Sequence, residues 1–124
     1  MNMKIQQSQE NYLETLYMLK HKKGFVRGID IANELGYSKA SVSVAMKSLR
    51  ESGYVTVGPD GDISLTETGL EIANRMYERH ELIANVLIAL GVSEETAYED
   101  SCKIEHVVSD ETIEKIKDFL NKNR

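Results

Sequence analysis

The sequence predicts a mostly α-helical protein with one small β-hairpin. Six segments repeat apolar residues at the three- and four-residue spacing of a helix face, and the stretch between the third and fourth alternates like a strand. Eight Lys and Arg against five Asp and Glu give residues 1–58 a net charge of +3, whereas seven against fifteen give residues 59–124 a net charge of −8. This order and this charge division predict a first domain over residues 1–66 and a second over residues 67–124.

Three helices are predicted in the first domain. The first covers about residues 5–22, and the second covers about residues 28–35. Gly36 follows the second helix, where a glycine suits the left-handed backbone that commonly ends helices. Ser38 is placed to accept a hydrogen bond from the first turn of the third helix, which Gly53 is expected to end.

A hairpin is predicted directly after the third helix. Residues 54–57 are rich in β-branched side chains, residues 58–61 are Gly-Pro-Asp-Gly, and residues 62–65 alternate polar and apolar side chains. Strand-forming segments on both sides of a turn sequence indicate two antiparallel strands.

Three further helices are predicted in the second domain. Thr66 is a plausible N-cap for a long helix over about residues 67–90. Another helix begins at Ser93 and reaches past Cys102, and the last covers about residues 109–120.

The second and third helices form a helix-turn-helix, and a hairpin directly after them gives the winged variant. The third helix exposes short hydroxyl side chains early and basic side chains late, which suits entry into the major groove of double-stranded DNA, although an ordinary solvated helix shows the same residue types. Its first two turns lack Arg, Asn and Gln, so phosphate contacts, DNA shape and contact with thymine methyl groups are expected to matter more than bidentate base recognition. The residues expected to contact DNA are Arg27, Ser38, Lys39, Ser41, Ser43, Lys47 and Arg50.

A second motif suggests a metal site. Cys102, Glu105 and His106 follow one another at helical spacing, so one helix face is expected to present a thiolate, a carboxylate and an imidazole. These donors together suit a transition-metal ion better than Mg²⁺ or Ca²⁺. The alternative is an inert buried cysteine beside an exposed Glu–His pair, because spacing alone does not show that distant donors converge. Further candidate donors are Asn11 and Glu14 on the first helix and His80 on the long helix.

Four stretches of the chain resemble the diphtheria-toxin-repressor family of iron- and manganese-dependent transcriptional repressors. They are ENYLETLY at residues 10–17, LTETG at 65–69, RHEL at 79–82 and CKIEHVVS at 102–109. The Cys-x-x-Glu-His-x-x-Ser pattern is the most specific of them.

The resemblance implies a winged helix-turn-helix that binds operator DNA and an α-helical domain for dimerisation and metal binding, acting together as a homodimer. It implies Fe²⁺ as the favoured cofactor and Mn²⁺ as the next, with Zn²⁺ or Co²⁺ able to substitute in vitro. The implied metal ligands are Asn11, Glu14, His80, Cys102, Glu105 and His106.

The sequence departs from the family pattern at several positions. Asn11 replaces the methionine of the iron-responsive branch and the aspartate of the manganese branch. Cys102 matches the iron branch and Glu14 the manganese branch. Ala84 and Tyr98 stand where the iron branch has ligands of an ancillary metal site, and the family's SH3-like C-terminal domain is not expected. Because a soft thiolate disfavours Mn²⁺, we expect Fe²⁺.

Two alternatives remain at this stage. One is a winged-helix regulator that does not sense metal. The other is an enzyme that uses Cys102 and His106 as a nucleophile–base pair, which is disfavoured because no Gly-rich oxyanion loop accompanies them. We therefore expect no enzyme and no small-molecule substrate. With one cysteine, no leader-like N-terminus and no long apolar run, we expect a cytoplasmic protein with no membrane partner.

Overall fold

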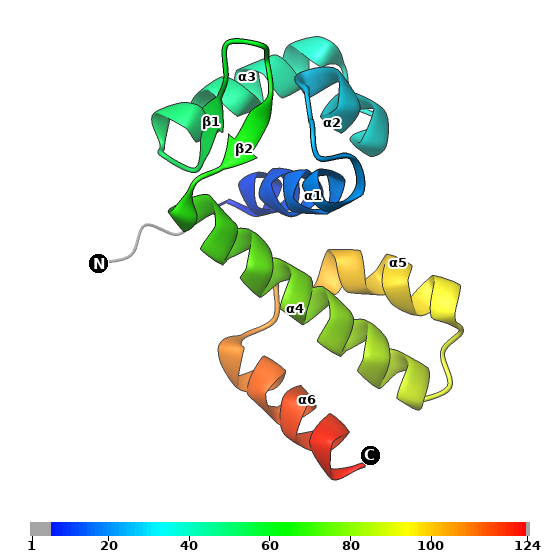
Figure 1. Ribbon diagram of the computed structural model, residues 1–124. Helices are drawn as coiled ribbons and strands as arrows, with labels where there is room; N and C mark the ends of the chain where they lie inside the picture. Colours follow the sequence, from blue (N-terminus) through cyan, green and yellow to red (C-terminus); the bar gives the residue numbers. More distant parts are fainter. Residues whose placement is uncertain (1–5, 124) are drawn as a thin grey trace. The chain divides into compact units, whose positions relative to one another are not determined.

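The computed structural model describes residues 6–123, which form six helices and one two-stranded antiparallel sheet (Figure 1). The chain divides into two compact units, with the division between Asn74 and Arg75. The elements in chain order are α1 (Gln7–Lys23), α2 (Gly28–Leu35), α3 (Lys39–Glu51), β1 (Val55–Val57), β2 (Ile63–Leu65), α4 (Glu67–Ala89), α5 (Glu94–Ile104) and α6 (Asp110–Lys122).

Every predicted helix and strand is present. The expected start of the first helix at residue 5, and the segment interpreted as lacking a leader, lie largely outside the described residues. Ser38 caps α3 by accepting a hydrogen bond from the Ser41 N–H at 3.1 Å. Thr66 caps α4 in the same way, accepting from the Gly69 N–H at 3.1 Å. Gly36 has the left-handed backbone (φ 71°, ψ 28°) that its place after α2 predicts.

The first unit is built around a core to which α1, α2, α3 and both strands contribute. Its three helices and the hairpin surround apolar side chains that the helical and strand periodicities place on inward faces. The most deeply buried of these are Leu13, Leu16, Val26, Ile31, Val42, Leu49 and Val55.

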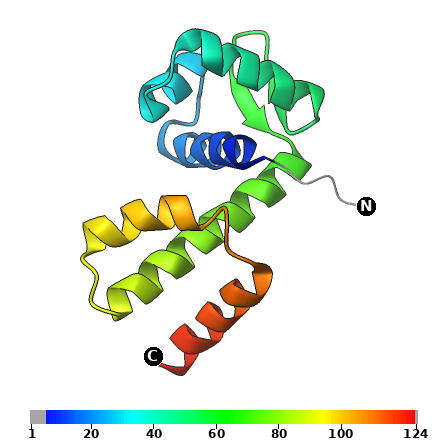
Figure 2. The ribbon, with the colours of Figure 1, turned by 180° about the vertical axis from the view of Figure 1, so that it is seen from behind.

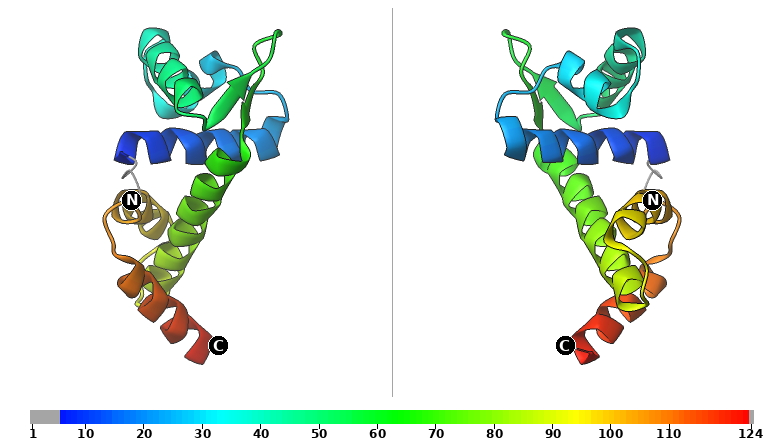
Figure 3. Two further views of the ribbon diagram at one scale, coloured as in Figure 1. Left: turned by 90° about the vertical axis from the view of Figure 1, so that its left-hand side faces the viewer. Right: turned by 90° about the vertical axis from the view of Figure 1, so that its right-hand side faces the viewer.

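The hairpin is held to the loop that precedes α2. The Ile63 N–H donates to the Val26 carbonyl at 2.8 Å. The Asp62 carboxylate accepts from the Val26 N–H at 3.0 Å and from Lys20 Nζ at 2.7 Å. As Figures 2 and 3 show, α3 and the tip of the hairpin lie on the side of the first unit away from α1. The fold therefore presents both on one surface.

The second unit consists of most of α4 with α5 and α6. Met76, Ile83 and Ala84 of α4 are buried together with Ala97 of α5 and Ile113 of α6. Among the described residues, no helix combines the length and the apolarity that a bilayer crossing requires.

Candidate metal centre

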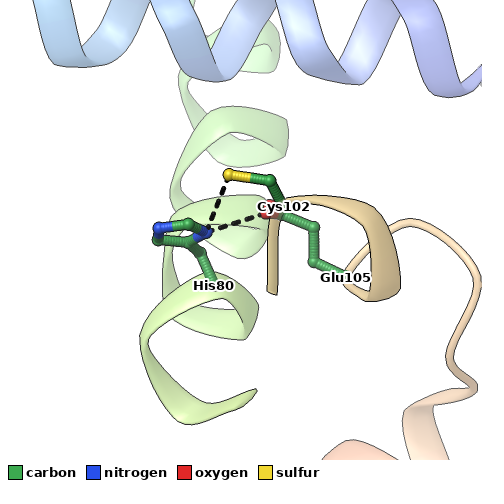
Figure 4. Close-up of side chains that lie close together, drawn as sticks. All are labelled: His80, Cys102 and Glu105. Atoms are coloured by element: carbon green, nitrogen blue, oxygen red, sulfur yellow. Dashed lines mark hydrogen bonds and ion pairs between the residues drawn. The ribbon is translucent and has the colours of Figure 1, made fainter. Parts of the chain in front are cut away.

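α4 and α5 bring together three of the candidate metal ligands in the second unit: His80, Cys102 and Glu105 (Figure 4). His80 Nδ1 lies 2.9 Å from Glu105 Oε1 and 3.8 Å from Cys102 Sγ. One donor atom from each residue lies within 4.8 Å of the donor atoms of the other two. Figure 4 shows that the imidazole of α4 faces both side chains of the α5 segment.

Ser101 fixes α5 against α4 beside this group. Its side chain is fully buried, and its hydroxyl donates to the His80 carbonyl at 2.5 Å. The same hydroxyl lies 3.3 Å from His80 Nδ1. Ser101 thereby holds the backbone of one ligand next to the helix that carries the other two.

The prediction that one helix face carries Cys102, Glu105 and His106 is wrong in one respect. α5 ends at Ile104, Glu105 is its C-cap, and His106 lies in the following turn. Glu105 keeps helical backbone angles (φ −56°, ψ −27°), so its side chain continues the face of Cys102. His106 is outside the group formed by His80, Cys102 and Glu105, but a nitrogen of its ring lies within 4.8 Å of a Glu105 carboxylate oxygen, so its role as a ligand stays a prediction.

Arg79 holds the turn in which these ligands end. Its buried guanidinium donates from Nη1 to the Glu105 carbonyl at 3.1 Å and to the Val108 carbonyl at 2.8 Å. It also forms an ion pair with the Asp110 carboxylate at the start of α6. These contacts fix the backbone that carries Glu105.

The electrostatics of the group centre on a buried carboxylate. Glu105 is 0% exposed. Hydrogen bonds with Cys102 and Glu105 raise the pKa of His80 to about 10 against the opposing effect of its burial. The protonated imidazole therefore supplies the positive charge that Glu105 requires. A metal ion held by His80 would replace that proton, because a histidine ligand binds in its deprotonated form.

The residues present fit a transition-metal ion. Among the described residues, Glu105 Oε2 is a buried side-chain oxygen without a hydrogen-bond partner, so the fold leaves one strong acceptor available. The three donors are a nitrogen, a sulfur and an oxygen, a set that suits transition metals better than Mg²⁺ or Ca²⁺. Cys102 is exposed, which leaves its sulfur accessible.

Sequence reasoning missed the residues that support these ligands. Arg79 lies within the RHEL stretch, whose pattern assigns it no role, and Ser101 carries no signal of its own. Tyr98, noted only as a lost ligand position, donates from its hydroxyl to Glu81 Oε2 at 2.9 Å, and its ring packs against His80 with centroids 5.4 Å apart. Asn11 and Glu14 lie on α1 in the first unit. Their role as ligands stays a prediction.

The residues predicted to contact DNA are exposed on α3 and at the start of α2. Ser38, Lys39, Ser41, Ser43, Lys47 and Arg50 are all exposed. Arg27 precedes α2, and its guanidinium lies 5.1 Å from the centre of the Phe25 ring. Its side chain also packs against Gly61 of the hairpin turn, where an added Cβ would lie 3.6 Å from Arg27 Nε.

Comparison with known proteins identifies the family. Residues 4–63 match the iron dependent repressor, N-terminal DNA binding domain, and residues 66–124 match the iron dependent repressor, metal binding and dimerisation domain. The chain belongs to the iron-dependent repressor family. An uncharacterised HTH-type transcriptional regulator of Methanocaldococcus jannaschii is 37% identical to it over 94% of each chain. This family regulates transcription, which removes the enzyme alternative for Cys102 and His106.

Other members of the iron-dependent repressor family are similar over most of this chain. The HTH-type transcriptional regulator MntR of Bacillus subtilis is 36% identical over 91% of this chain and 80% of its own length. The structure of the manganese regulator SloR matches with a TM-score of 0.80 and 29% identity, over 91% of this chain and 53% of SloR. The chain thus spans about half the length of SloR. A manganese-dependent transcriptional repressor in complex with manganese matches with a TM-score of 0.85, 26% identity and coverage of 91% and 52%.

Proposed function

We propose that this protein is a transcriptional repressor that binds operator DNA as a homodimer when it carries a divalent transition-metal ion. The observation that carries the proposal is the group formed by His80, Cys102 and Glu105, in which a buried carboxylate oxygen has no hydrogen-bond partner. The matched domain descriptions support the same assignment, with DNA binding in the N-terminal part and metal binding and dimerisation in the C-terminal part.

The proposal divides the work between the two parts of the chain. Residues 1–66 contact DNA through α3, Arg27 and the hairpin, and residues 67–124 bind metal and form the dimer. His80, Cys102 and Glu105 are the principal ligands. Asn11, Glu14 and His106 complete the metal coordination in this proposal.

Two metals are candidates. Fe²⁺ is favoured by Cys102, because a thiolate is a softer ligand than Mn²⁺ prefers. Mn²⁺ is the second candidate, because similar proteins include a manganese regulator and a manganese-dependent transcriptional repressor. The carboxylates of Glu14 and Glu105 suit either ion.

The protein's own residues define how metal acts. In the metal-free protein, the His80 imidazolium balances the buried Glu105 carboxylate. A bound dication would supply that positive charge in place of the proton on the His80 imidazole. Metal favours a DNA-binding state only if it binds that state more tightly than the inactive state. In this proposal, donors on α1 provide the difference in affinity.

The test is anaerobic DNA binding to candidate promoter fragments, titrated separately with Fe²⁺, Mn²⁺ and Zn²⁺ and then treated with a chelator. We expect one metal to switch binding on at micromolar concentration and the chelator to reverse it.

Alanine variants of Cys102, Glu105 and His106 are each expected to lose metal-dependent binding and remain dimers by size-exclusion chromatography. Glu99→Gln, an exposed carboxylate on α5, is the matched control. Equal DNA affinity with and without chelator would instead support the regulator that does not sense metal.

A further inference from the structure

α3 carries a large apolar side chain that the fold does not use. Val44 is 71% exposed, whereas Val42 and Met46, two residues to either side, are 1% and 6% exposed. Two residues correspond to about 200° of rotation around a helix, so Val44 points almost directly away from the core that Val42 and Met46 enter.

Three of the four neighbours of Val44 on this exposed face have short side chains. The residues three and four positions away are Ala40, Ser41, Lys47 and Ser48, all exposed. Ala ends at Cβ and Ser at Oγ, so these three side chains extend no further from the helix than the two methyl groups of Val44. The patch is small enough for a close approach to another surface.

The charges of α3 favour a polyanion. Lys47 lies one turn from Val44 on the same face, and Lys39 and Arg50 are exposed on the sides of the helix. Glu51, also exposed, is the acidic residue on the side of Val44. It lies seven residues further along, or about 10 Å along the axis, at the end of α3.

Neither folding nor helix formation explains a valine here. An exposed isopropyl group buries little apolar surface, and a β-branched residue has a lower helix propensity than alanine. DNA gives it a specific partner, because the C5 methyl of thymine is the apolar group that base pairs present in the major groove. Residues 39–49 contain no Arg, Asn or Gln, so the bidentate readers in this stretch of α3 are Lys39 and Lys47, and both suit guanine rather than an A·T pair.

We propose that Val44 is a specificity-determining residue that reads a thymine by packing its methyl groups against the thymine C5 methyl. The inference rests on the proposed DNA-binding function. It adds the residue and the chemical group through which α3 distinguishes thymine from other bases.

The test replaces single thymines with deoxyuridine, which lacks the C5 methyl and keeps the hydrogen-bonding edge. Duplexes are first selected from a random library with the full-length protein in the presence of Fe²⁺ or Mn²⁺. Each thymine is then replaced in turn, and the dissociation constant is measured for the unmodified protein and for Val44→Ala. We expect about a fourfold loss of affinity at one or two positions for the unmodified protein, the value of one buried methyl group. For Val44→Ala, we expect less than a twofold loss at those positions.

Met18→Ala is the control, because Met18 is an exposed apolar residue of α1, outside α3 and the hairpin. It is expected to retain the full uridine effect at those same positions. Val44→Ala is expected to melt at the same or a slightly higher temperature. A loss of the uridine effect in this variant is then not caused by unfolding. A Val44→Ala protein that keeps the fourfold effect, or an unmodified protein with no effect at any thymine, would overturn the inference. If no duplex is enriched with either metal, the DNA-binding function itself fails, and the inference fails with it.

Discussion

At the scale of single residues, Glu105 is the most informative side chain in the molecule. A fully buried carboxylate is costly to retain unless a positive charge or hydrogen bonds compensate it. His80 pairs with one of its oxygens, and the other oxygen has no partner among the described residues. A binding site explains this arrangement better than folding does, because a fold that required only stability would pair both oxygens or replace the carboxylate.

Glu105→Gln tests this interpretation directly. The amide keeps the shape of the side chain and one acceptor but removes the negative charge that attracts a dication. We expect the metal affinity to fall at least tenfold. Loss of a residue that only supports a ligand costs about 10- to 100-fold, so loss of a direct ligand should cost no less. Calorimetric titration with Mn²⁺, or with Fe²⁺ under anaerobic conditions, measures the affinity. The metal-free protein is expected to remain folded by circular dichroism.

The control for this variant is Glu99→Gln on α5, which removes the same charge from an exposed position. It separates a loss of ligand from a change in net charge. Equal metal affinities for Glu105→Gln and Glu99→Gln would show that Glu105 is not a ligand.

The ligand types could be predicted from the sequence, but their grouping could not. Cys102 and Glu105 are close in the chain, so helical spacing alone brings them together. His80 joins them only because α4 packs against α5, a tertiary contact that no local pattern encodes. The position of His106 beyond the end of α5 could not be predicted, because helix ends are poorly determined by periodicity. Arg79 and Ser101 act through backbone carbonyls, which leave no side-chain pattern to find.

At the scale of the elements, Gly69 sets how closely the hairpin approaches α4. It is buried in the first turn of α4. A Cβ at this position would collide with the Tyr54 carbonyl oxygen and lie 3.0 Å from the Tyr54 carbonyl carbon and 3.3 Å from Leu65 Cδ2. Since a backbone atom cannot yield as a flexible side chain does, the strand or the helix must move to accommodate a methyl group.

Gly69→Ala is therefore expected to lower the free energy of unfolding by about 2–3 kcal/mol, the upper part of the range for overpacked sites. Urea denaturation followed by circular dichroism measures the loss. The matched control is Gly28→Ala, where the added Cβ would lie an ordinary 3.8 Å from Val42 Cγ1. Gly28→Ala is expected to be neutral or to stabilise by up to about 1 kcal/mol. If both variants unfold at the same urea concentration, the close approach at Gly69 is not needed for stability.

Asp62 links the hairpin to α1 and to the loop before α2, and this link depends on pH. Hydrogen bonds from Lys20 Nζ and the Val26 N–H hold the pKa of Asp62 below its ordinary value. A carboxyl group with a lowered pKa in the folded state stabilises that state above its unfolded pKa of about 4. The stabilisation is lost as the pH falls through the lower, folded pKa.

We expect Asp62→Asn to unfold more easily than the unmodified protein at pH 6 and above. The difference in melting temperature should shrink as the pH falls from about 4 toward the lower, folded pKa. The same substitution in a Lys20→Met background should have a smaller effect, because the principal partner is already absent. A melting-temperature difference that stays constant from pH 3 to pH 7 would contradict this role.

The order and type of every element could be predicted from sequence, because each depends on local signals: apolar periodicity, Ser38 and Thr66 as caps, and the Gly-Pro-Asp-Gly turn. The contacts of Gly69 and Asp62 could not be predicted. Gly69 meets the Tyr54 carbonyl, and Asp62 meets Val26 and Lys20, which are 36 and 42 residues away in the chain, so packing decides these approaches. The turn sequence predicts the hairpin, but no local pattern predicts its attachment through Val26 and Lys20.

At the scale of the whole molecule, the predicted DNA contacts lie in the basic N-terminal part of the chain, and the principal metal ligands of the proposal lie in the acidic C-terminal part. The N-terminal part carries the basic side chains of α3, and the acidic C-terminal part carries His80, Cys102 and Glu105. A metal ion held only by residues of the second unit affects DNA binding only if its affinity differs between the active and inactive states. The proposed function therefore requires an energetic connection from metal to α3, and Glu14 on α1 is the predicted contributor.

This connection predicts a reciprocal effect that can be measured. If metal increases the affinity for a selected duplex by a given factor, the duplex must increase the affinity for metal by the same factor, which we expect to be about 5- to 150-fold. Both factors are obtained from titrations of metal with and without duplex and of duplex with and without metal. In Glu14→Gln both should decrease together, because the variant removes a predicted metal donor from the unit that is proposed to contact DNA. If both factors are unchanged in Glu14→Gln, α1 does not provide the connection. The continuous helix α4, which begins in the first unit and ends in the second, then becomes the element through which metal acts on α3.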